Sequence, residues 1–105
     1  MEETPILIDV WTVDPSQQAK LARMISDGVK EVIVGHPGFV SAQLYESTNG
    51  DAMMVMVHMR TIEERRALTD SPAAHGLVRE LGEIARSHQR LFRLVESFGE
   101  SDEPS

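Results

Sequence analysis

The sequence contains no cysteine, so it can form neither a disulfide framework nor a thiolate metal site. It also has little positive charge, because 10 Lys and Arg stand against 17 Asp and Glu and give a formal net charge of -7. Such an excess of acidic residues repels a phosphate backbone, and no basic cluster offsets it. We therefore expect neither nucleic acid nor an anionic membrane as a partner.

Long hydrophobic runs are absent as well, and none approaches the ~20 apolar residues that a membrane span requires. The opening MEETPILIDV is acidic where a secretory signal needs a basic segment. With the lack of cysteine, these features favour a cytoplasmic protein. The four histidines predict no metal site, because no two of them share a helical i, i+4 or a strand i, i+2 spacing.

The 105 residues, 41% of them hydrophobic, suffice for one small core. We expect a single domain over residues 1–98 and an acidic, disordered tail, GESDEPS, over residues 99–105. Apolar periodicity and capping signals predict a strand at 6–13, a helix at 17–34, strands at 39–47 and 52–60 joined by an Asn-Gly turn, helices at 61–68 and 71–86, and a strand at 90–98.

This order of elements is the ferredoxin-like α+β arrangement βαββαβ, with one antiparallel sheet and its helices on one face. The strands ILIDVWTV and AMMVMVHM carry apolar residues at both odd and even positions. A strand that is apolar on both sides is usually buried on both sides, yet the helices cover only one. We therefore predict a homodimer in which two sheets pack together as a dimeric α/β barrel. A monomer with an exposed apolar face is the alternative.

The stretch HPGFVSAQLYESTNGDAMMVMVHMRTIEE, residues 36–64, carries a Pro-Gly-Phe, strand, turn, strand, Ser/Thr-x-Glu pattern. It resembles the antibiotic biosynthesis monooxygenase family of small dimeric ferredoxin-like barrels, and the similarity extends over about residues 6–98. The resemblance implies a substrate pocket between the sheet and the helices of each protomer. The family includes cofactor-independent oxygenases of aromatic polyketides, quinol oxygenases and heme-degrading oxygenases.

Two features depart from the family pattern. Many catalytic members carry Trp at the end of the third strand, where this chain has Met59. The heme-degrading branch carries Asn in the first strand, matched best here by Asp9, whose carboxylate cannot donate as an amide does. The helical His of that branch is matched only by His75, which lies closer to the Ser-Pro cap.

Asp9 and His58 are the candidate catalytic residues, because a cofactor-free oxygenase needs a base that makes an electron-rich substrate anion. Asp9 lies between two apolar residues of the first strand, where burial would raise its pKa towards that of a useful base. A structural, hydrogen-bonded Asp is the alternative. His58 lies between two apolar residues of the third strand, and a structural histidine is its alternative.

Trp11 and Tyr45 are candidates for substrate binding. Trp11 lies two residues after Asp9 and therefore shares its face of the strand. It can stack on a substrate or pack in the core. Tyr45 lies on the more polar side of the second strand, which can line a pocket or form a solvated edge.

His75, Met53 and Met59 complete the predicted substrate site. His75 falls on the polar side of the second long helix beside Arg79, where simple solvent exposure is the alternative. Met53 and Met59 share one face of their strand. Flexible methionines can adapt to a ligand between sheet and helices, or simply fill the core.

Through this resemblance we predict a cofactor-independent monooxygenase that uses dioxygen on a small aromatic substrate of the polyketide or quinol type, without a bound metal or flavin. A non-catalytic ligand-binding or accessory dimer of the same fold is one alternative. A heme-degrading oxygenase is the other.

Overall fold

One antiparallel sheet organises the chain in this computed structural model, which describes residues 4–99. Apart from Gly99, the predicted acidic tail lies outside the described residues. The elements are β1 (Ile6–Val13), the 3-10 turn η1 (Pro15–Gln17), α1 (Gln18–Gly28), the π-helical turn η2 (Val29–Ile33), β2 (Phe39–Glu46), β3 (Ala52–Met59), α2 (Ile62–Thr69), α3 (Pro72–Leu81) and β4 (Ala85–Phe92). The strand order is β2-β3-β1-β4. The predicted ferredoxin-like α+β fold is confirmed.

Short capping signals set where the helices begin. The Thr61 side chain accepts a hydrogen bond from the backbone N–H of Glu64 at 3.1 Å and starts α2. Ser71 accepts from the backbone N–H of Ala74 at 3.2 Å, with Pro72 at the first helical position of α3. Both helix starts agree with the capping patterns in the sequence.

The β2–β3 hairpin closes at the predicted Asn-Gly turn. Gly50 has φ +83°, in the left-handed region that favours glycine. The Ser47 backbone N–H donates to the Ala52 carbonyl at 2.9 Å, so pairing begins immediately after the turn. A register shift between Phe39 and Ser41 marks a bulge near the start of β2.

The end of the second long helix and the last strand differ from the prediction. Helix α3 ends at Leu81 instead of residue 86, in a turn where the Ile84 backbone N–H donates to the Leu81 carbonyl at 3.2 Å. Strand β4 begins at Ala85 and pairs with the whole of β1, so the predicted strand at 90–98 was set five residues late. Within β4 only Ala85 is buried, and such a polar edge strand gives no apolar alternation to detect.

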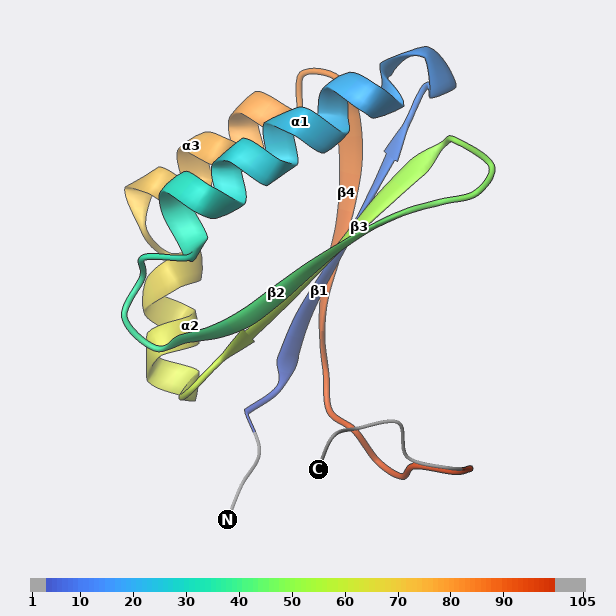
Figure 1. Ribbon diagram of the computed structural model, residues 1–105. Coiled ribbons are helices and arrows are strands. Elements are labelled where there is room, and N and C mark those ends of the chain that lie inside the picture. Colours follow the sequence, from blue (N-terminus) through green and yellow to red (C-terminus); the bar gives the residue numbers. More distant parts are fainter. Residues whose placement is uncertain (1–3, 100–105) are drawn as a thin grey trace.

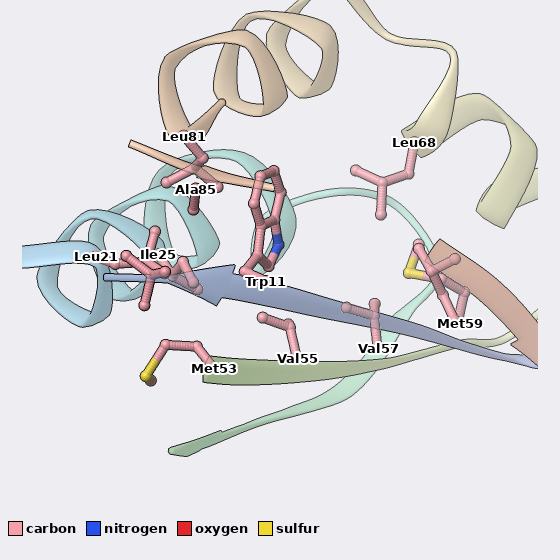
Figure 2. Packing of buried hydrophobic residues seen from close by; sticks show 12 residues of the cluster. Trp11, Leu21, Ile25, Met53, Val55, Val57, Met59, Leu68, Leu81 and Ala85 are labelled. Carbon is pink, nitrogen blue, oxygen red and sulfur yellow. The ribbon is translucent and has the colours of Figure 1, made fainter. Parts of the chain in front are cut away.

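All the helices lie on one face of the sheet (Figure 1). Beneath them the odd-numbered residues of β3 form the centre of the core together with residues of β1, α1, α2 and α3, as Figure 2 shows. The buried set is Leu7, Trp11, Val13, Leu21, Ile25, Met53, Val55, Val57, Met59, Leu68, Leu81 and Ala85. The even-numbered residues of β1 and β3 face away from the helices.

That second face, which we call the open face, is apolar at its centre. Ile8, Val10, Met54 and Met56 lie on the two central strands, and each is half-buried with no helix of the described chain over it. After β4 the chain continues with residues 93–98, in which Val95 is 94% exposed. The structure therefore reproduces the two-sided apolar pattern of the sequence and covers one of the two sides.

Candidate functional site

A cavity of about 420 Å³ lies between the helices and the sheet. Its floor comes from β1, β3 and β4, and its walls come from α1, η2, α2 and α3. The lining is Leu7, Asp9, Trp11, Ile25, Val29, Val32, Ile33, Val55, Val57, Leu68, Thr69, Ala74, His75, Leu77, Val78, Arg79, Leu81 and Gln89. A mostly apolar cavity of this size with a few polar groups is typical of a small-molecule site.

The π-helical turn η2 shapes one wall. Its wide turn is closed by the Val34 backbone N–H, which donates to the Val29 carbonyl five residues earlier at 2.9 Å. Val29, Val32 and Ile33 all line the cavity. Single π-helical turns occur often at functional sites, because the wider turn redirects side chains.

Asp9 is the carboxyl group of the cavity floor. It is half-buried, and its Oδ1 is buried without a hydrogen-bond partner among residues 4–99. Burial raises the pKa of Asp9 from 3.8 to about 6, while a hydrogen bond from Trp11 and the charge of His88 each lower it by less. At neutral pH this carboxylate is ionised, poorly solvated and basic enough to accept a proton.

The neighbours of Asp9 are fixed by the pairing of β1. Val55 of β3 lies opposite it on one side and Gln89 of β4 on the other. Trp11, 3% exposed, rises from β1 towards the helices (Figure 2). The Asp9 carboxyl group therefore lies between an apolar residue and an amide, with the indole of Trp11 next to it along the strand.

The exposed lining residues show where the cavity opens. His75, Val78 and Arg79 of α3 and Gln89 of β4 line the cavity and are also exposed. Strand β4 is at one edge of the sheet. The mouth therefore lies between α3 and the β4 edge, and the apolar interior lies behind it.

The structure brings together three of the seven predicted site residues: Asp9, Trp11 and His75 all line the cavity. Met53 and Met59 lie on the predicted face, but they are 3% and 0% exposed and belong to the core outside the lining. Both methionines therefore fill the core, which was the alternative to a role in ligand binding.

His58 and Tyr45 lie on the other side of the sheet. Tyr45 pairs with Met54 and is 49% exposed, and His58 pairs with Ser41 and is half-buried. Both side chains belong to the open face, so the sheet separates His58 from Asp9. The two candidate bases do not share one cavity within a protomer.

Gln89, Thr69 and Arg79 line the cavity without having been predicted as site residues. Gln89 was missed because the last strand was placed at 90–98, which left it outside the sheet. Thr69 is the last residue of α2, and no capping signal marked it. For Arg79 the sequence does contain a signal: it follows His75 by four residues, which places both side chains on one face of the helix.

Residues 4–99 contain neither a metal-binding cluster nor a membrane-spanning helix. No group of three or more His, Cys, Asp or Glu side chains is placed to hold a metal ion. No helix within that range is long and apolar enough to cross a membrane.

Known proteins with this architecture were found by structure alone: no family model matches the sequence, and no curated protein matches it. SnoaB from Streptomyces nogalater, a cofactor-independent oxygenase, superposes with a TM-score of 0.70 at 16% identity, over 94% of this chain and 100% of that one. A provisionally assigned antibiotic biosynthesis monooxygenase from Deinococcus radiodurans gives a TM-score of 0.77 at 9% identity, over 92% and 98% of the two chains. The chain has the fold of the antibiotic biosynthesis monooxygenases.

A third structure of this fold contains a ligand. The monooxygenase from the gene ActVA-Orf6 of Streptomyces coelicolor, in complex with nanaomycin D, superposes with a TM-score of 0.72 at 23% identity, over 92% of this chain and 94% of that one. At these identities the likeness establishes the architecture that the sequence resemblance implied. The reaction has to be argued from the residues of the cavity.

Proposed function

We propose that this protein belongs to the antibiotic biosynthesis monooxygenases and is a cofactor-independent monooxygenase of a small, flat, largely apolar aromatic compound. The observation that carries the proposal is Asp9 on the floor of an apolar cavity, a carboxyl group with a raised pKa and with one oxygen that has no hydrogen-bond partner in the described part of the chain. The oxygenase SnoaB and the monooxygenase that holds nanaomycin D share the fold and support this choice of reaction.

The proposed reaction begins with transfer of a proton from the substrate to Asp9. The substrate is a carbon acid such as an anthrone, whose methylene C–H bond breaks and leaves an electron pair delocalised over the rings. This anion reduces dioxygen. One oxygen atom becomes the new carbonyl, and the other leaves as water with the two methylene hydrogens, so the methylene is oxidised and dioxygen is reduced. The apolar walls limit water around the anion.

The test is oxygen uptake with an anthrone or quinol substrate by the wild-type protein and by Asp9→Asn. We expect the variant to lose at least about 100-fold in kcat/KM, within the usual contribution of a general base. Asp27→Asn, which removes an exposed carboxylate on α1 outside this cavity, is the matched control and should keep wild-type activity. Undiminished turnover by folded Asp9→Asn would exclude the proposed base.

A non-catalytic ligand-binding or accessory role is the alternative outcome of the same experiment. It predicts that an aromatic ligand quenches the fluorescence of Trp11, the single tryptophan of the chain, without oxygen uptake. Heme degradation predicts a Soret band on addition of heme. We propose no role in proton transfer for His58, because it lies on the open face.

We also propose that the working form is a homodimer joined through the open face. Val10, Met54 and Met56 form an apolar centre there that the described helices leave uncovered, and extended apolar patches mark association sites. Light scattering should give twice the monomer mass of 11.7 kDa. Met56→Lys should shift this mass towards the monomer, and a monomeric wild-type protein would refute the dimer.

The expected cytoplasmic location stays a prediction that cell fractionation can test.

A further inference from the structure

The rim of the cavity carries a positive charge that the proposed proton transfer does not use. Arg79 lines the cavity and is exposed, so its side chain lies at the mouth. His75, four residues earlier on α3, lines the same mouth. Within the described lining, Asp9 is the one acidic side chain, and it lies on the floor.

Arg79 is not among the groups that shift the pKa of Asp9. A guanidinium within about 4–6 Å of a carboxyl group lowers the pKa of that group by about 1–3 units. The groups that do lower the pKa of Asp9 are Trp11 and His88, and burial outweighs both of them. The cavity therefore has a negative floor and a separate positive rim. Each charge is free to act on a bound molecule.

On the basis of the proposed function, we infer that Arg79 determines specificity and that the substrate is an aromatic acid. Its rings occupy the apolar interior, its reactive C–H or O–H group lies at Asp9, and its carboxylate lies at Arg79. A guanidinium recognises a carboxylate through two parallel hydrogen bonds, which selects for geometry as well as charge. The net charge of -7 gives anions no general attraction to this protein. A preference for an acid therefore depends on this local group.

A pair of ligands that differ only in this charge tests the inference. The binding of 1,4-dihydroxy-2-naphthoate and of its methyl ester is measured by calorimetry without oxygen, so that no turnover occurs. The wild-type protein should bind the acid at least tenfold more tightly than the ester. Arg79→Gln should remove this preference and leave the affinity for the ester unchanged. Arg23→Gln, at an exposed arginine of α1 outside the cavity lining, is the charge-matched control and should retain the preference.

The outcomes separate this inference from the proposed function. Equal affinity of the wild-type protein for acid and ester, or an equal loss of both in Arg79→Gln, overturns the role of Arg79. If the ester is then still oxidised with uptake of oxygen, the proposed function stands. Conversely, a preference for the acid that depends on Arg79, with no oxygen uptake on either compound, confirms the carboxylate site and contradicts the monooxygenase.

Discussion

Replacing Asp9 by Asn should make the protein more stable, by an amount that depends on pH. In the folded state the pKa of this carboxyl group is about 6 instead of 3.8, chiefly because of burial. Between these two values folding favours the protonated form, so the wild-type protein loses stability as the pH rises from about 4 to above 6. Asn never ionises and avoids this loss. Its side-chain oxygen can still accept the hydrogen bond from Trp11.

The size of the effect follows from the pKa change. A shift from 3.8 to about 6 is about 2 units, and each unit corresponds to about 1.4 kcal/mol, which sets a ceiling of about 3 kcal/mol. Because Asp9 is only half-buried, solvent screens part of this penalty. We therefore expect Asp9→Asn to gain about 1–2 kcal/mol above pH 7 and almost nothing below pH 4. For a domain of this size, 1 kcal/mol corresponds to about 4–8 °C in Tm.

Urea unfolding of both proteins at pH 4 and at pH 8 checks this expectation. The quantity that matters is the difference between variant and wild type at each pH, because the other carboxyl groups titrate equally in both proteins. Asp27→Asn, which removes an exposed charge, is the control. Its stability relative to the wild type should not rise comparably from pH 4 to pH 8. A stability gain of Asp9→Asn that is absent at pH 8, or equal at both pH values, would refute the raised pKa.

Three further substitutions test the surroundings of the site. Trp11→Phe removes the donor that lowers the pKa of Asp9, so the midpoint of the kcat/KM profile against pH should move upward. Gly28→Ala places a methyl group against the side chain of Leu77; overpacking should outweigh the gain in helix propensity and cost about 1 kcal/mol in urea unfolding. In a Leu77→Ala background the same change should be stabilising, and an unchanged sign would contradict the contact. Thr61→Ala removes the cap of α2 and should cost about 1 kcal/mol, seen as a lower urea midpoint at unchanged slope.

The parts of the fold that depend on local signals could be predicted from the sequence. The strand at 6–13 and the Asn-Gly hairpin agree with the structure, because strand alternation and turn chemistry act over a few neighbouring residues. The predicted end of α3 does not agree with the structure. Ile84 and Ala85 continue the apolar stripe of that helix, yet Ala85 pairs with Val13. Pairing with β1 is a long-range interaction, and it overrides the local helical pattern.

The residues of the candidate site fall into the same two groups, those that local patterns predict and those that depend on long-range contacts. Asp9 and Trp11 could be placed on one face from strand alternation alone, and the structure agrees. Gln89 depends on the register of β4, and that register was not predicted. Met59 lies in the core with 0% exposure because it is covered from the helix side. Sequence alternation could assign its face but could not show where on that face the cavity lies.

The alternation along β1 links the proposed chemistry to the proposed assembly. Asp9 and Trp11 face the cavity, whereas Ile8 and Val10 face away from it. Pairing with β3 and β4 fixes this register on both sides. A slip of one residue would move Asp9 and the indole of Trp11 to the open face together. A substitution at Val10 leaves the register of β1 unchanged. It should therefore disturb association while Asp9 keeps its place in the cavity. The proposed assembly and the proposed proton transfer can therefore be perturbed separately, although they involve adjacent residues of one strand.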